Sequence, residues 1–157
     1  MARSGGDGTA TRRMMLGALG AAAVAGTGLR PAPAGATPES ARALVDGIVA
    51  GRTPIENGVR LELPEIAENG SSVPVTIAVE SPMTVDDHVT ALHLVSERNP
   101  EALIATARFT PTSGRAALAT RMRLAESQTV WAVAETSTGA VLVGRRRVTV
   151  TVGGCEA

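Results

Sequence analysis

The chain has 157 residues, and its 15 basic and 15 acidic side chains give a formal net charge of zero. The first 36 residues hold four of the arginines and one aspartate, so the rest of the chain carries a net charge of −3. A nucleic-acid-binding domain would show a basic patch or stripe, and this acidic balance argues against that class. The 121 residues after position 36 make one domain of ordinary size. A single cysteine excludes an internal disulfide.

The start of the chain has the order of features of a twin-arginine export signal. The pair Arg12-Arg13 precedes an uncharged apolar stretch at residues 16–29. At 14 residues this stretch is too short to span a bilayer, which needs about 20, and it suits the apolar core of a signal peptide. Ala34-Gly35-Ala36 supplies a small-residue cleavage site. We expect a signal at residues 1–36 and export to the periplasm; the alternative is an apolar N-terminal helix of the folded domain.

One helix is predicted after the signal, at residues 39–50. Its apolar residues recur at helical spacing. Thr37 and Pro38 supply an N-cap and a first helical residue, and Gly51 can end the helix. A helix this short needs a larger surface to pack on, in this chain or in a partner.

From residue 59 onward the pattern changes to short strands separated by turn residues. Pro74, near the start of one strand, indicates a sheet edge. Residues 88–96 are apolar on both faces and predict a central strand, and the last strand is expected to turn its three valines inward. Short strands at regular spacing, with turn residues between them, predict an all-β fold, a β-sandwich at residues 37–152 that includes the N-terminal helix. The expected strands are 59–63, 73–80, 88–96, 102–110, 115–124, 129–135, 140–143 and 145–152.

The most distinctive chemistry lies at the C-terminus. Cys155 follows Gly153 and Gly154 and is two residues from the end of the chain. A cysteine kept for packing belongs in a core, whereas a chain end after two glycines favours motion. Residues 153–155 could carry the sulfur roughly 10 Å beyond the last strand. The spacing therefore suggests a thiol on a flexible arm at residues 153–157; an incidental surface cysteine and an intermolecular disulfide stay open as alternatives.

Other chemistries find less support in the sequence. His88 and His93 are five positions apart on one predicted strand, so they face opposite sides, and Cys155 alone does not complete a zinc site. We therefore predict no metal, with one histidine in a sheet face and one at its rim. A cysteine hydrolase needs a rigidly held nucleophile, and a thiol after two glycines is held loosely, which favours a carrier over a catalyst.

A run of three arginines, residues 145–147, begins the last predicted strand. The favoured interpretation is a solvated strand start. The alternative is a patch that meets an acidic partner or concentrates small anions.

Several segments of the mature domain carry a family resemblance. They are Leu63-Pro64-Glu65-Ile66-Ala67-Glu68-Asn69-Gly70, residues 73–84, residues 109–115, residues 120–125 and Val150-Thr151-Val152-Gly153-Gly154-Cys155. In these segments, and in its leader, the chain resembles SoxY, the sulfur-carrier subunit of the bacterial Sox system for thiosulfate oxidation.

The resemblance implies an immunoglobulin-like sandwich that pairs with SoxZ as a heterodimer. It also implies that Cys155 is the covalent attachment site for sulfur intermediates, without a separate cofactor, and that the chain itself is not an enzyme. In that scheme the cytochrome SoxAX joins thiosulfate oxidatively to the thiol and SoxB releases sulfate, with a sulfane dehydrogenase as a further candidate partner. The runner-up function is a non-catalytic binding or structural module whose cysteine forms an intermolecular disulfide.

The chain departs from the family at its last two residues. The family pattern ends Gly-Gly-Cys-Gly-Gly, whereas here Glu156-Ala157 follows the cysteine. A negative charge beside the thiol disfavours the reactive thiolate and repels an incoming anion. The departure bears on the efficiency of loading rather than on the attachment chemistry.

Overall fold

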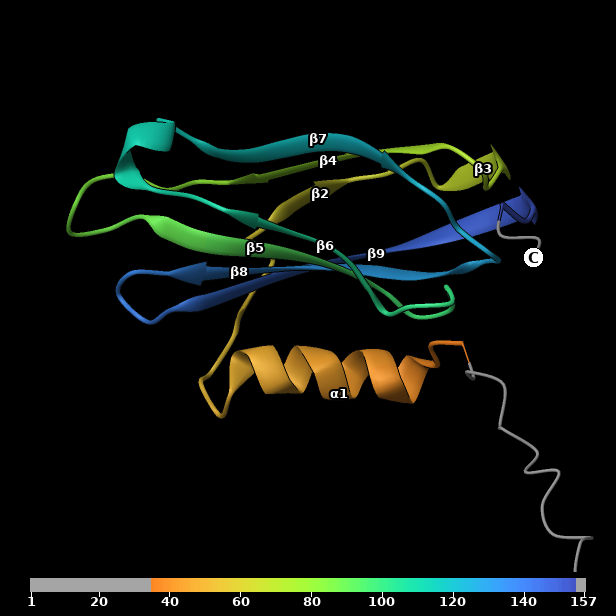
Figure 1. Cartoon of the computed structure of the whole chain (residues 1–157), viewed down its shortest axis with the longest axis horizontal. Coiled ribbons are helices and arrows are strands. Elements are labelled where there is room, and N and C mark those ends of the chain that lie inside the picture. Colours follow the sequence, from red (N-terminus) through yellow and green to blue (C-terminus); the bar gives the residue numbers. More distant parts are fainter. Residues whose placement is uncertain (1–34, 155–157) are drawn as a thin grey trace, which may run out of the picture. The chain divides into compact units, whose positions relative to one another are not determined.

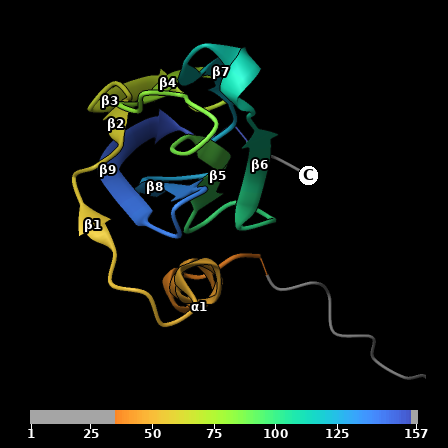
Figure 2. The same ribbon diagram turned by 90° about the vertical axis from the view of Figure 1, so that its left-hand side faces the viewer.

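Two β-sheets pack face to face, and a helix covers the outer face of the larger one (Figures 1 and 2). The computed structural model describes residues 35–154, so nearly all of the predicted export signal lies outside the described residues. The helix α1 spans Pro38–Val49, and the strands are β1 Ile55–Glu56, β2 Arg60–Glu62, β3 Ile66–Asn69, β4 Val73–Val79, β5 Val89–Ser96, β6 Leu103–Arg108, β7 Ala116–Met122, β8 Gln128–Thr136 and β9 Val141–Val152. The larger sheet has the order β1-β9-β8-β5-β6 with β3 also paired to β9, and the smaller has the order β2-β4-β7.

The main core lies between the two sheets. Strand β4 shows the alternation that predicted it, because Val73, Val75, Ile77 and Val79 are all buried. They pack with Leu92 and other core-facing residues of the larger sheet. The prediction of an all-β, immunoglobulin-like sandwich with a short N-terminal helix is confirmed.

Helix α1 begins and ends as its sequence predicted, to within one residue. The Thr37 side chain accepts a hydrogen bond from the Ser40 amide at 3.2 Å, and Pro38 is the first helical residue. Val45, on the buried face, packs against Trp131 and Val133 of β8. The helix therefore packs within this chain, and β8 is buried on both faces. Among residues 35–154 no helix has the length and apolar character that crossing a membrane requires.

Strand β9 differs from its prediction in two ways. The two strands expected at 140–143 and 145–152 form one continuous strand of 12 residues through Gly144. Val152 was expected to face the core, yet it is 58% exposed. Strand β8 pairs with β9 only as far as Val148, so the last residues of β9 lie past the end of β8 at the end of the sandwich, where the short strand β3 is the strand paired with them.

The edge position predicted from Pro74 is wrong, because β4 is the middle strand of the smaller sheet. Strand β2 has three residues, and its pairing with β4 ends at Thr76. Pro74 therefore lies beyond the end of β2, where no partner strand requires an N–H on that side.

Two short strands were not predicted at all. Strands β1 and β3 both pair with β9 in parallel, Ile55 with Leu142 and Ile66 with Thr149. Strand β3 lies beside the C-terminal half of β9, and it brings the turn after Asn69 next to the end of that strand.

Candidate functional site

Strand β9 leads to the end of the sandwich at which β3 lies beside it, and we call this the candidate carrier end (Figure 1). Gly153 and Gly154 follow β9 and are the last residues that the structure describes. The Gly154 amide donates a hydrogen bond to the carbonyl oxygen of Leu124 at 2.9 Å. The predicted thiol, Cys155, lies outside the described residues. The structure thus places the two residues before the thiol against the connection between β7 and β8.

A third segment reaches the same place, the turn between β3 and β4. The Gly70 amide donates to the Val152 carbonyl at 2.7 Å, and the Gly70 carbonyl accepts from the Leu124 amide at 2.8 Å. Sequence reasoning assigned the arm to Gly153 and Gly154, whereas Gly70 and Leu124 entered it only within segments that carry the family resemblance, with no role at the site. The sequence marks Asn69-Gly70 as a turn, yet nothing local indicates that this turn meets the C-terminus.

Two buried side-chain amides hold the β7–β8 connection in place. Asn99 Nδ2 donates to the Arg123 carbonyl at 2.8 Å, and Asn99 Oδ1 accepts from the Ala125 amide at 3.1 Å. Gln128, which is fully buried, donates to the same Asn99 oxygen at 2.9 Å. Buried polar groups with complete hydrogen bonding fix the backbone they contact. The loop that receives Gly154 is therefore held in place.

An ionic cluster lies on the helix-facing side of the larger sheet. Glu135 of β8 accepts from Arg52 at 2.8 Å and lies 3.2 Å from His93 Nε2, while His93 Nδ1 lies 3.0 Å from the Thr106 hydroxyl. The Arg52 hydrogen bond holds the pKa of Glu135 below its ordinary value, against partial burial, and His93 adds to the effect. Glu135 pairs with Val141 at the start of β9, so this cluster lies at the opposite end of that strand from the C-terminus.

The histidines occupy the places expected of them, one in the sheet and one at its rim. His93 lies within β5, and His88 precedes that strand, with its amide donating to the Ser137 hydroxyl at 3.1 Å. The side-chain Nδ1 of His88 is buried without a hydrogen-bond partner among the described residues. Within residues 35–154, no three side chains of the metal-binding types cluster closely enough to hold an ion.

The arginine run is exposed, as expected for a solvated segment, but two of its members have partners. The Arg145 guanidinium lies 5.4 Å from the centre of the Trp131 ring, and Arg146 lies 3.4 Å from the Glu65 carboxylate. Trp131 in turn donates to the Glu97 carboxylate at 3.2 Å. Exposed pairs of this kind contribute little stability, typically under about 1 kcal/mol.

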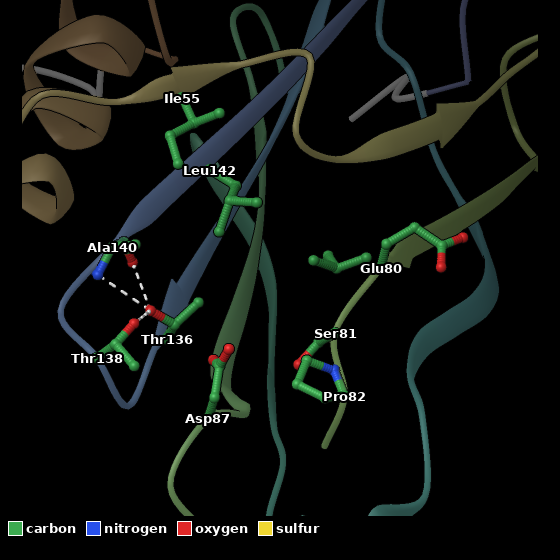
Figure 3. Close-up of a pocket in the computed structure, with 10 residues that line it drawn as sticks. Ile55, Glu80, Ser81, Pro82, Asp87, Thr136, Thr138, Ala140 and Leu142 are labelled. Carbon is green, nitrogen blue, oxygen red and sulfur yellow. Dashed lines mark hydrogen bonds between the residues drawn. The ribbon is translucent and has the colours of Figure 1, made fainter. Parts of the chain in front are cut away.

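A pocket of about 170 Å³ opens beside the β8–β9 hairpin. Figure 3 shows Asp87 between Thr136 and Thr138 on one side and Ser81 and Pro82 on the other, with Ile55 and Leu142 above them. Because Leu142 belongs to the first residues of β9, the pocket lies at the opposite end of that strand from Gly153. We therefore do not include it in the candidate site.

Comparison with known proteins gives one family. The sequence profile of the family described as "Sulfur oxidation protein SoxY" matches residues 46–155. The structure of the sulfur carrier protein SoxY from Chlorobium limicola f thiosulfatophilum is similar at 31% sequence identity, covering 72% of this chain and 100% of that chain with a TM-score of 0.57. A search of curated proteins gave no match.

Other solved structures share the fold at lower identity. A superoxide reductase (neelaredoxin) from Ignicoccus hospitalis is 17% identical, covering 73% of this chain and 92% of that one with a TM-score of 0.54. A putative superoxide reductase from Thermotoga maritima is 16% identical, covering 63% and 88% with a TM-score of 0.50. At this identity the likeness concerns the fold alone.

Proposed function

Because this chain belongs to the SoxY family and is a sulfur carrier in sulfur oxidation, we propose that Cys155 is the residue to which the sulfur intermediates are attached. The observation that supports this most directly is that the family match extends to Cys155, the single cysteine of the chain. A covalent sulfur carrier needs a nucleophile that forms S–S bonds, and the cysteine thiolate is that nucleophile.

The loading step is an oxidation. The Cys155 sulfur forms a bond to the outer sulfur of thiosulfate, the thiol proton is released, and two electrons pass to the c-type cytochrome SoxAX. The product is a thiosulfonate on Cys155. Water then attacks the terminal sulfonate sulfur in a step that SoxB catalyses, the S–S bond to that group breaks, and sulfate leaves with a persulfide retained on Cys155.

The catalytic groups for these steps belong to the partners. A carrier needs a thiol that several enzymes can reach, whereas an enzyme needs its nucleophile fixed beside a base. We therefore propose a non-enzymatic role, with SoxZ as the stable partner in a heterodimer. SoxAX, SoxB and a sulfane dehydrogenase bind transiently. The chain needs no cofactor besides the sulfur intermediates bound to Cys155.

The site of action is proposed to be the periplasm. The arginine pair at residues 12 and 13, the short apolar stretch and the small-residue cleavage site support export by the twin-arginine pathway. Export of a folded chain would also allow SoxZ to cross the membrane together with it.

Mass spectrometry of the protein from thiosulfate-grown cells tests the attachment site. Intact mass and the mass of the C-terminal peptide are measured with and without reductant. We expect sulfur and thiosulfonate adducts on the Cys155 peptide that reductant removes, and none in a Cys155→Ser variant. A bare thiol, or only a disulfide-linked dimer, would contradict the carrier site and favour the structural role.

A further inference from the structure

The last described residues of the chain are bound to two other backbone segments. Gly70 donates to the Val152 carbonyl, Leu124 donates to the Gly70 carbonyl, and Gly154 donates to the Leu124 carbonyl, at 2.7, 2.8 and 2.9 Å respectively. We call Gly70, Leu124-Ala125 and Gly153-Gly154 the backbone clamp. Its hydrogen bonds join the β3–β4 turn, the β7–β8 connection and the C-terminal segment.

The three glycines of the clamp are needed because a Cβ atom would not fit at their positions, and not because of their backbone conformation. None of them lies in the left-handed region, where glycine is usually needed. A Cβ atom on Gly153 would overlap the Ala125 carbonyl oxygen, and one on Gly154 would overlap the Gly70 backbone. A Cβ on Gly70 would overlap the Leu124 carbonyl oxygen and lie 2.9 Å from the Gly154 nitrogen. Each glycine thus lets another backbone approach closely.

The support under the clamp is rigid. Asn99 and Gln128 are buried and bond to each other, and Asn99 also bonds the backbone on both sides of Leu124. The Leu124 carbonyl, which accepts the hydrogen bond from the Gly154 amide, is therefore held in a fixed position in the sandwich.

We propose that the backbone clamp fixes the point at which the carrier arm leaves the sandwich, and that Gly70 is a positioning residue for Cys155; this rests on the proposed function of that cysteine. With Gly154 held, Cys155 is the next residue, and consecutive Cα atoms are only about 3.8 Å apart. A chain free from Gly153 onward would span roughly 10 Å. Partner enzymes must therefore approach the end of the sandwich that carries the backbone clamp. Gly153 and Gly154 then belong to the fixed part of the chain, and the arm begins after them.

Amide hydrogen exchange on the purified full chain tests the clamp without using its function. We expect the Gly154 amide to exchange about tenfold or more slowly than in an unstructured peptide. In a Gly70→Ala variant it should lose this protection, while the Val133 amide in the centre of β8 keeps its own. Exchange of Gly154 in the wild type at the unstructured rate would overturn the clamp.

A loading experiment tests the positioning role. The rate at which SoxAX loads thiosulfate is measured for the wild type, for Gly70→Ala and for Gly47→Ala, whose new Cβ would meet open space. We expect loading of Gly70→Ala to fall about tenfold or more, since small misplacements are costly to reaction geometry. Gly47→Ala should load like the wild type. Alkylation of the thiol by iodoacetamide needs no docking and should change by less than about twofold in each variant.

The outcomes separate this inference from the proposed function. Equal loading of Gly70→Ala and the wild type would overturn the positioning role while leaving Cys155 as the carrier site. A wild-type chain that is never loaded would overturn the carrier site and with it the positioning role, and hydrogen exchange would still decide whether the clamp exists. If Gly70→Ala does not fold, Gly154→Ala, at the end of the chain, makes the same comparison.

Discussion

The Arg52 guanidinium lies 2.8 Å from the Glu135 carboxylate and so joins the end of helix α1 to strand β8. Arg52 also donates to the carbonyl oxygens of Ile48 and Val49, which are among the last of the helix and have no partner within it. One side chain therefore bonds to the last carbonyls of the helix and attaches the helix to the sheet. This attachment adds to the apolar packing of α1 over Trp131.

Replacing Glu135 by glutamine should destabilise the fold by about 1 kcal/mol, because it removes a partly buried ion pair while keeping the shape of the side chain. Urea unfolding followed by Trp131 fluorescence measures the change, since this tryptophan lies under the helix. Arg60→Gln is the matched control, because the Arg60–Glu62 pair is far more exposed. It should cost less than about 0.5 kcal/mol. Equal losses in both variants would contradict the role given to Glu135.

The same carboxylate should make stability depend on pH in the acid range. The hydrogen bond from Arg52 lowers the pKa of Glu135 from its ordinary value of 4.5. A group with a lowered folded pKa contributes its full stability above the unfolded value, and the contribution is lost as pH falls through the folded value. Unfolding free energies measured from pH 6 down to 3 should therefore fall more steeply for the wild type than for Glu135→Gln.

Some pH dependence should remain in that variant. A backbone hydrogen bond at the start of α1 also lowers the pKa of the exposed Glu39, and Glu39 is unchanged in Glu135→Gln. If the wild type and Glu135→Gln lost stability identically as the pH falls, Glu135 would titrate in the same way in the folded and unfolded chains.

The sequence predicted helix α1 and strand β4 well because both are determined by interactions between residues close together in the chain. Thr37 and Pro38 mark the start of α1 because capping involves neighbouring residues, and the valines of β4 mark one face because side chains alternate along a strand. Strands β1 and β3 escaped prediction because they are short and their partner, β9, lies far along the chain. The edge prediction from Pro74 was wrong because β2 ends before it reaches Pro74, so a proline is tolerated there in a middle strand. The length of β2 cannot be read from the residues around Pro74.

The glycines show the same limit at the candidate site. Gly153 and Gly154 suggested freedom of motion, since glycine usually provides it. In the structure they lie against the Ala125 and Gly70 backbones, a contact that only the tertiary fold creates. Gly144 likewise separated two predicted strands. In the structure it lies inside β9, where the absence of a Cβ lets the Val59 backbone pack close to the strand.

Substituting alanine for Gly144 should destabilise the sandwich by about 1–3 kcal/mol, because the new Cβ would overlap the Val59 carbonyl oxygen and lie 3.2 Å from the Val59 Cβ. Thermal or urea unfolding gives the change. Gly47→Ala, in the middle of α1, is the control, since its Cβ would have no neighbour within 4 Å. It should stabilise the protein by roughly 0.5–1 kcal/mol through helix propensity. A neutral Gly144→Ala would mean that Val59 can move away without cost.

The last prediction concerns the charge beside the thiol. Glu156 replaces a glycine of the family pattern, and thiosulfate is a dianion. In water, two unit charges about 6 Å apart repel by roughly 0.7 kcal/mol, which corresponds to about a threefold effect on rate for each charge on the anion. Glu156→Gly should therefore raise the loading rate by about two- to tenfold at low salt. The gain should shrink as salt is added, because the Debye length is about 8 Å at physiological ionic strength.

Glu156→Gln separates charge from bulk in the same assay, because glutamine keeps the size of glutamate and removes its charge. If repulsion limits loading, the glutamine variant should match the glycine variant at low salt, and both should approach the wild type at high salt. A faster glycine variant beside an unchanged glutamine variant would assign the effect to the bulk of residue 156. Equal rates in all three proteins would show that the partner enzymes of this chain accept an acidic residue next to Cys155.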